Sequence, residues 1–177
     1  MTTFTIIHYS AEVLAFSMLI SMLVQDWRWR GVYWYFFPLL AVLFFGLRLD
    51  QQPLETVLAD SAVNVAFVVL QMLVLSLYVR LRFAASLQAY LGLGDILYWL
   101  AVAVFFSPVV FILYYLSSLV VALLTFLIVR RVVSKPIDAR IPLAGLQAGY
   151  LALLLLVSWL SPTKLPVGDQ WLLDYIS

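Results

Sequence analysis

The chain has 177 residues, of which 66% are hydrophobic and 11% charged, and its net charge is +1. A soluble domain is about half apolar and about a quarter charged, so this composition excludes a soluble protein and indicates an integral membrane protein. The lack of cysteine excludes disulfides and thiolate chemistry, and the single histidine, His8, argues against a histidine-rich metal site. We therefore expect no cofactor, and the charge gives no support for a nucleic-acid partner.

Long apolar runs predict an all-α bundle of six transmembrane helices. Each run should be helical, because backbone polar groups inside lipid have to be hydrogen-bonded. The runs in chain order are Thr5–Gln25, Gly31–Leu47, Ala59–Val79, Leu91–Phe106, Val109–Val129 and Pro142–Leu160. The second and fourth are short, since roughly 16 residues span about 24 Å, less than the hydrocarbon thickness of about 30 Å. We expect one domain over residues 1–160, followed by a polar interfacial tail over 161–177.

The distribution of basic residues predicts the orientation in the membrane. The predicted loops after the first, third and fifth helices carry Arg28, Arg30, Arg80, Arg82, Arg130, Arg131, Lys135 and Arg140. The loops on the other side carry Arg48 and Lys164. Cytoplasmic loops are enriched in lysine and arginine, so the first set is expected in the cytoplasm and both termini outside. This points to a multi-pass protein of the plasma (inner) membrane.

Two aspartates lie at helix ends on the predicted cytoplasmic side. Asp26 follows the first apolar run, and Asp95 closes the sequence Gly92-Leu93-Gly94-Asp95 at the head of the fourth. An acidic residue at the edge of a membrane helix is costly and is a candidate functional residue. The plainer interpretation is a helix cap for Asp95 and ion pairing with Arg28 and Arg30 for Asp26.

Two carboxylates at one site have a definite chemical capacity. Peptide hydrolysis without a metal or a covalent nucleophile needs a base to activate water and an acid to protonate the leaving amine. Two neighbouring carboxylates share one proton and so supply both roles. Asp26 and Asp95 are therefore candidate partners in an acid/base pair, and Gly92 and Gly94 would let an extended substrate approach the backbone closely.

The chain resembles the type IV prepilin and preflagellin peptidases, the GxGD class of membrane aspartyl proteases. Gly92-Leu93-Gly94-Asp95 is similar to the GxGD motif, and Asp26-Trp27-Arg28-Trp29-Arg30-Gly31-Val32 to the segment of the first aspartate. Arg140-Ile141-Pro142-Leu143-Ala144-Gly145 is similar to the segment that opens the last helix of the family. Two positions depart from the family pattern: Leu97 replaces a lysine, and Tyr33 replaces a proline.

The resemblance implies an aspartyl endopeptidase that removes the basic leader of pilin-like precursors at the cytoplasmic side of the membrane. It implies that Asp26 and Asp95 are catalytic and that Gly92 and Gly94 shape the backbone of the site. The residues implied to support the site or the substrate are Arg28, Arg30, Ile141 and Pro142. The chain lacks the cysteine-bearing insertion of longer members, so no N-methyltransferase activity is expected.

Two other functions remain open at this point. The first is a related membrane scaffold without turnover, consistent with Leu97 and Tyr33. The second is a small proton-linked transporter, although such carriers often show internal repeats and the sequence shows none. We expect His8 to pair with Glu12 near the outer surface, away from the site.

Two polar residues and one glycine pattern are expected to hold the helices together. We expect Asn64 and Gln71 to make hydrogen bonds between helices. We also expect Gly145-Leu146-Gln147-Ala148-Gly149, a GxxxG pattern, to pack helices closely.

Overall fold

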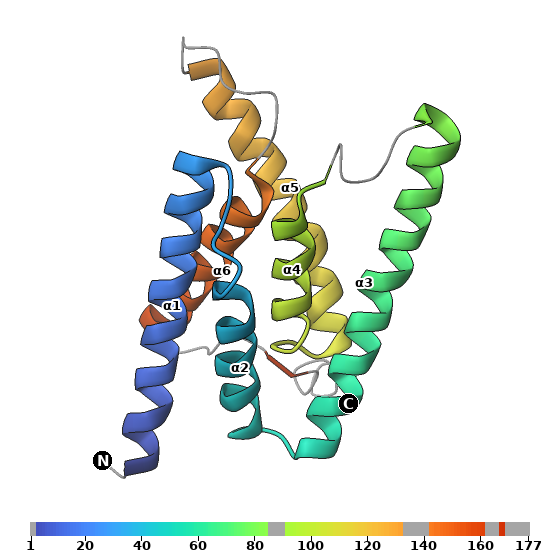
Figure 1. Cartoon of the computed structure of the whole chain (residues 1–177). Coiled ribbons are helices and arrows are strands. Elements are labelled where there is room, and N and C mark those ends of the chain that lie inside the picture. Colours follow the sequence, from blue (N-terminus) through green and yellow to red (C-terminus); the bar gives the residue numbers. More distant parts are fainter. Residues whose placement is uncertain (1–2, 85–90, 133–141, 162–166, 169–177) are drawn as a thin grey trace. The chain divides into compact units, whose positions relative to one another are not determined.

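The computed structural model describes residues 3–84, 91–132, 142–161 and 167–168, and this part of the chain is all-α (Figure 1). Its helices are α1 (Thr3–Trp29), α2 (Phe36–Leu49), α3 (Leu54–Phe83), α4 (Leu93–Val102), α5 (Pro108–Val132) and α6 (Leu143–Leu160). Four contain segments long and apolar enough to cross a membrane, namely Ile6–Trp29, Leu54–Phe83, Pro108–Arg131 and Leu143–Leu160. The all-α prediction and the assignment to the multi-pass membrane class are confirmed.

The two remaining helices are shorter than the sequence predicts. Helix α2 has 14 residues and begins at Phe36 rather than at Gly31, with Pro38 in its first turn, where proline is tolerated. Helix α4 has 10 residues and ends at Val102. At about 1.5 Å per residue they extend about 21 and 15 Å, too short for hydrocarbon of about 30 Å. The structure therefore supports six helices, of which four are of spanning length.

The chain divides into two compact units, which we describe separately. Unit 1 comprises Met1–Phe36 and Ile112–Pro166, and unit 2 comprises Phe37–Phe111 and Val167–Ser177. The single domain over residues 1–160 and the orientation in the membrane remain predictions. The predicted interfacial tail, apart from Ser161 and residues 167–168, and the basic residues Lys135, Arg140 and Lys164 lie outside the described residues.

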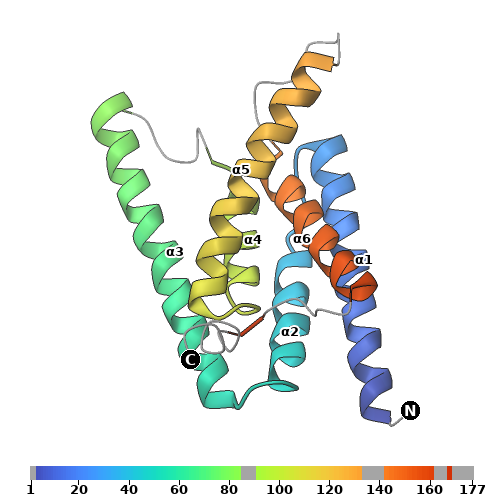
Figure 2. The same cartoon turned by 180° about the vertical axis from the view of Figure 1, so that it is seen from behind.

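Unit 1 is organised by the packing of α6 against α1, which run side by side in both views (Figures 1 and 2). A Cβ atom added to Gly149 would lie 3.0 Å from a methyl group of Leu23, so the helix backbones approach closely there. The expected packing role of the GxxxG pattern is confirmed. At the other end of this contact, Glu12 pairs with His8 at 3.4 Å, as expected, and also accepts a hydrogen bond from Trp159 at 3.1 Å.

A polar network joins α5 to α6 within unit 1. Gln147 is fully buried, and its Nε2 atom donates a hydrogen bond of 2.9 Å to Ser118 Oγ. Tyr114 donates from its hydroxyl to the Gln147 carbonyl at 3.0 Å, and its ring stacks on that of Tyr150. These bonds satisfy polar groups that hydrocarbon cannot solvate and so fix how α6 is rotated against α5.

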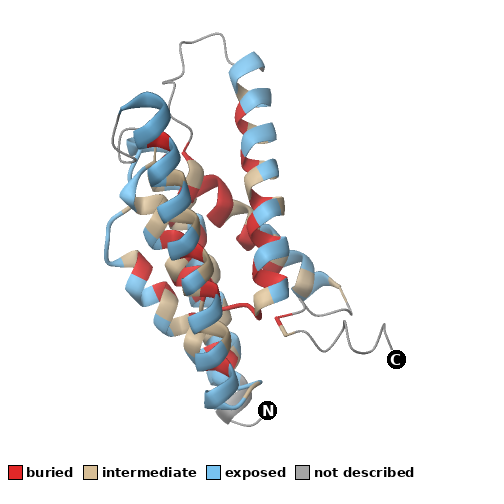
Figure 3. Cartoon of the chain, turned by 90° about the vertical axis from the view of Figure 1, so that its right-hand side faces the viewer, coloured by how far each residue is buried: buried red, intermediate tan, exposed pale blue. Residues whose placement is uncertain are grey.

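The described helices are mostly apolar on their exposed faces. Figure 3 shows the buried positions as short red segments along otherwise exposed or half-buried ribbon. On α3 the buried residues are Val57, Asn64, Val68 and Val79, which form a narrow stripe at helical spacing. Leu70, Leu73 and Leu81 of the same helix are more than 60% exposed. Exposed apolar surface of this extent is typical of a lipid-facing helix.

We expect Ala84→Gly to stabilise the protein. Ala84 ends α3 in the left-handed conformation, with φ of 50° and its N–H bonded to the Arg80 carbonyl. This conformation costs an L-residue about 1–2 kcal/mol and glycine almost nothing, so the net gain should be about 1 kcal/mol. The melting temperature in detergent should rise by about 2–4 °C.

The matched control for this change is Ala62→Gly, at an exposed position in the interior of the same helix. It should lower the melting temperature, because glycine inside a helix is less favourable than alanine by about 0.5–1 kcal/mol. Equal shifts of the same sign in both variants would contradict the assignment of strain to Ala84.

Candidate active site

Asp26 lies inside α1, one turn before the end of the helix, and its side chain faces α6. It is 7% exposed, and its Oδ2 atom accepts a hydrogen bond of 2.7 Å from the backbone N–H of Gly145. Gly145 is the third residue of α6, which follows Pro142. The first N–H groups of a helix have no partner within it and form its positive end, which favours a carboxylate. Asp26 therefore caps the last helix from the first.

The close approach of these two helices requires glycine at position 145. A Cβ atom there would lie 2.6 Å from the Cβ of Asp26 and 3.0 Å from its Oδ2. Around this contact Leu23 and Leu143 pack on a small buried core of Ala122, Phe126 and Leu146. The carboxylate is thus held by one backbone donor and by apolar packing. Within the described residues this backbone donor binds Oδ2.

The segment that follows Asp26 is basic and aromatic. Arg30 adopts a left-handed conformation with φ of 54° and donates its N–H to the Asp26 carbonyl at 3.0 Å, which ends the helix. Its charge also interacts electrostatically with the Asp26 carboxylate. Arg28 and Trp29 are exposed. The plainer interpretation of Asp26, ion pairing with a nearby arginine, therefore keeps partial support, but the direct hydrogen bond is to Gly145.

Asp95 lies in the first turn of α4, and its Oδ2 atom accepts a hydrogen bond of 3.1 Å from the N–H of Gly92. A Cβ atom on Gly92 would lie 3.2 Å from that oxygen, whereas one on Gly94 would be at ordinary contact distance from Phe37. No glycine in the described part of the chain has a positive φ. Glycine at position 92 therefore serves close approach to the carboxylate rather than a left-handed turn. Asp95 is half-buried, and the expected cap geometry is present.

The structure brings together some of the predicted site residues. Asp26 meets Gly145, which lies in the segment opened by Pro142, so the first and third family-like segments converge in unit 1. Asp95 and Gly92 converge in unit 2. Because Asp26 and Asp95 belong to different units, their pairing stays a prediction. Ile141 lies outside the described residues.

Sequence reasoning missed that Gly145 is the direct partner of Asp26. We interpreted the glycine pattern as packing alone, although its first glycine follows the Ile-Pro pair by three residues. That position is in the first turn of a helix, where backbone donors are unpaired. This signal was sufficient to predict a bound carboxylate there, but not which carboxylate.

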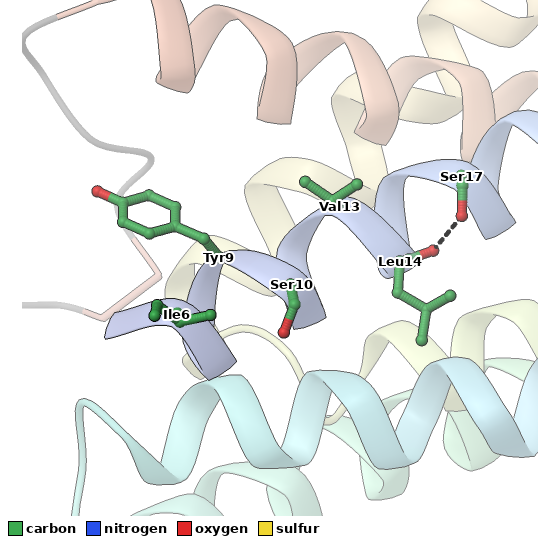
Figure 4. A pocket seen from close by; sticks show the side chains of 6 residues that line it. All are labelled: Ile6, Tyr9, Ser10, Val13, Leu14 and Ser17. Atoms are coloured by element: carbon green, nitrogen blue, oxygen red, sulfur yellow. Dashed lines mark hydrogen bonds between the residues drawn. The ribbon is translucent and has the colours of Figure 1, made fainter. Parts of the chain in front are cut away.

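A pocket of about 690 Å³ on α1 does not belong to this site (Figure 4). Its lining residues are Ile6, Tyr9, Ser10, Val13, Leu14 and Ser17. The hydroxyls of Ser10 and Ser17 are each bonded at 2.8 Å to carbonyls of their own helix. Ser17 and Asp26 are separated by two and a half helical turns, so they lie on opposite faces. The pocket is lined mainly by apolar surface, and both of its serine hydroxyls are bonded within α1.

No group of three or more histidine and acidic side chains that could hold a metal occurs within the described ranges. The described fold defines a multi-pass α-helical membrane protein with two aspartates, each of which accepts a hydrogen bond from a backbone N–H at the start of a helix. No protein-family model, curated protein or solved structure matches the chain.

Proposed function

We propose that this protein is a membrane-embedded aspartyl endopeptidase that cleaves the basic leader from type IV pilin-like precursors at the cytoplasmic side of the membrane. The observation that carries the proposal is the hydrogen bond between Asp26 and Gly145. It joins the segment of the first aspartate to the segment that opens the last helix, two of the three segments in which the chain resembles the prepilin peptidases. Packing alone needs small residues at this contact but not a buried carboxylate.

In the proposed reaction, Asp26 and Asp95 hold one water molecule and share one proton. The ionised carboxylate takes a proton from the water as its oxygen attacks the scissile carbonyl carbon. The protonated carboxyl donates its proton to the carbonyl oxygen, which gives a neutral tetrahedral intermediate. The carbon–nitrogen bond then breaks as the carboxyl that took the water proton donates it to the amine nitrogen, while the other carboxylate takes a proton from a hydroxyl of the intermediate. This leaves a new carboxyl terminus and a new amino terminus and returns the pair to its singly protonated state.

The arrangement around each aspartate supports these roles. The Gly145 N–H orients one oxygen of Asp26, and the Gly92 N–H orients one oxygen of Asp95. Arg28 and Arg30 border Asp26 on the side where a leader would enter. Both arginines are cationic, so they would orient the substrate backbone rather than bind the basic side chains of a leader.

The test is cleavage by the purified protein in lipid vesicles. A panel of pilin-like precursors, each with a short basic leader and an apolar helix, is incubated with the parental protein and the products are mapped by mass spectrometry. We expect one cut, between leader and apolar helix, in at least one precursor. A control membrane protein with an apolar helix and no basic leader should stay intact. A folded protein that cleaves no precursor of the panel would favour the scaffold alternative.

A further inference from the structure

Outside the candidate active site, unit 2 contains a polar cluster of the buried residues Arg48 and Asn64 and the half-buried residue Asp60. Arg48 is 1% exposed; its Nη2 atom donates to Asp60 Oδ2, and its Nη1 atom donates to the Phe106 carbonyl at 2.9 Å. Asn64, also 1% exposed, donates from Nδ2 to the carbonyls of Ala103 and Phe106, at 2.9 and 2.8 Å. We call these three residues the clamp.

The clamp holds the point at which the chain leaves α4. Helix α4 ends at Val102 and α5 begins at Pro108, so the carbonyls of Ala103 and Phe106 fall in the break between the helices. Carbonyls at a helix end have no partner within the helix, and at membrane depth they need another donor. The clamp makes three hydrogen bonds to these two oxygens. Arg48 of α2 donates to the Phe106 carbonyl, and Asn64 of α3 donates to the carbonyls of Ala103 and Phe106.

Helix α2 also contacts the opposite end of α4. The Phe37 ring lies 3.7 Å from the position of a Cβ on Gly94, and the Phe44 ring stacks on Phe105 with centroids 4.2 Å apart. Contacts to α2 therefore occur near both ends of α4. Asp95 lies eight residues before Ala103, which corresponds to about 12 Å along the helix.

We infer that the clamp is a positioning device that sets the depth and rotation of α4 and thereby places the Asp95 carboxylate; this role rests on the proposed function. A short helix moves as a rigid body, so a shift at Ala103 is transmitted to the first turn. Arg48, Asp60 and Asn64 act through α4 and need not touch substrate.

The contacts of Arg48 indicate that its side chain positions the backbone after α4 more than it adds to the stability of the fold. Its Nε atom is buried and has no hydrogen-bond partner in the described part of unit 2. Burial of the Arg48 charge carries a desolvation cost, which its ion pair with the half-buried Asp60 offsets only in part. What an apolar side chain cannot replace is the donation to the Phe106 carbonyl, which fixes the direction of the backbone at that point.

The test uses a distance that does not depend on catalysis. The chain has no cysteine, so Leu77→Cys on α3 and Leu93→Cys in the first turn of α4 can carry a pair of spin labels. Both side chains are exposed, and both helices belong to unit 2. We expect one narrow distance distribution in the parental background, and a distribution at least twice as wide in Asn64→Leu and Arg48→Met. Ser61→Ala is the matched control, because the Ser61 hydroxyl binds the Val57 carbonyl of its own helix.

A second measurement connects the clamp to the reaction. Without the spin labels, Asn64→Leu should lower kcat for precursor cleavage by about 10²-fold and leave KM within about twofold, since misplacement of a reacting group by about 1 Å has an effect of this size. A structural role alone would lower the folded fraction and leave kcat per folded molecule unchanged. If Arg48→Met does not fold, Arg48→Lys keeps the charge beside Asp60 but lacks the guanidinium fork, and it should also widen the distribution.

The outcomes separate the two proposals. Unchanged distance distributions in folded clamp variants would overturn the clamp, whether or not precursors are cleaved. A widened distribution without any cleavage by the parental protein would uphold the effect on α4 and overturn the proposed function. A widened distribution with unchanged kcat would show that the reaction does not depend on how the clamp holds α4, and so would overturn the positioning role.

Discussion

Asp26→Asn and Asp95→Asn should each lower the rate of precursor cleavage by about 10³-fold, within the range of about 10²–10⁴ for loss of general acid–base catalysis. Asparagine cannot take a proton from water, so neither variant keeps an acid/base pair. In both proteins the amide oxygen can still accept the hydrogen bond that the carboxylate accepts, from Gly145 at position 26 and from Gly92 at position 95. The fold should therefore persist, and the loss should appear in kcat.

The matched control is Glu55→Gln. Glu55 is an exposed acidic residue in the first turn of α3, as Asp95 is an acidic residue in the first turn of α4. This variant should cleave at the parental rate. Melting curves in detergent verify that each variant is folded. Parental rates in either folded aspartate variant would mean that the two carboxylates do not form the catalytic pair.

Gly145→Ala should produce the second large effect, through the geometry of Asp26 rather than its chemistry. The added Cβ would lie 2.6 Å from the Asp26 Cβ, closer than two carbon atoms can approach. Helix α6 has to move away from α1, which breaks or lengthens the bond to Oδ2. Overpacking of this kind costs about 1–3 kcal/mol, and displacement of the carboxylate should lower cleavage by about 10²-fold.

The same substitution at Gly46 is its control. An added Cβ at Gly46, in the interior of α2, meets nothing within 4 Å. Gly46→Ala should leave cleavage unchanged and raise the melting temperature slightly, because alanine is the better helix former. Full activity in Gly145→Ala, with the melting temperature of the parental protein, would contradict the close approach of Asp26 to α6.

Hydrophobic pattern predicted the fold class well and the helix ends less well. The apolar runs located all six helices, because an apolar run in lipid has few alternatives to a helix. Two helix ends differ from the prediction for physical reasons. Helix α1 extends to Trp29 because the Arg30 N–H bonds to the Asp26 carbonyl there, and α2 starts at Phe36, shortly before Pro38, because proline is tolerated in the first turn of a helix. Helix α4 ends at Val102 because donors from other helices satisfy the carbonyls that follow.

Arg48 shows why the polar interior was harder to predict. The sequence places it directly after an apolar run, which indicated a loop. The structure includes it in α2 as a fully buried side chain, because Asp60 and the Phe106 carbonyl are close enough to receive its donors. Asn64 was predicted to bond another helix, but its partners are backbone carbonyls in the break between α4 and α5, which leave no trace in a residue pattern.

The candidate site was predictable in its residues and only partly in its contacts. The free-energy cost of an acidic residue at the edge of a membrane helix, together with the resemblance, identified Asp26 and Asp95 from the sequence alone. That Gly145 is the donor to Asp26 depends on how α6 lies against α1, and such a contact between distant segments is not encoded in local spacing. The same applies to the pairing of Asp26 with Asp95.

The hydrogen bond between Asp26 and Gly145 spans 119 positions of the chain. A ribosome therefore completes α1 long before it makes the residue on which this carboxylate depends. Until then the Asp26 carboxylate lacks the backbone donor that it has in the folded unit 1. The bond can therefore form only after α2 to α5 and the first turn of α6 have been made.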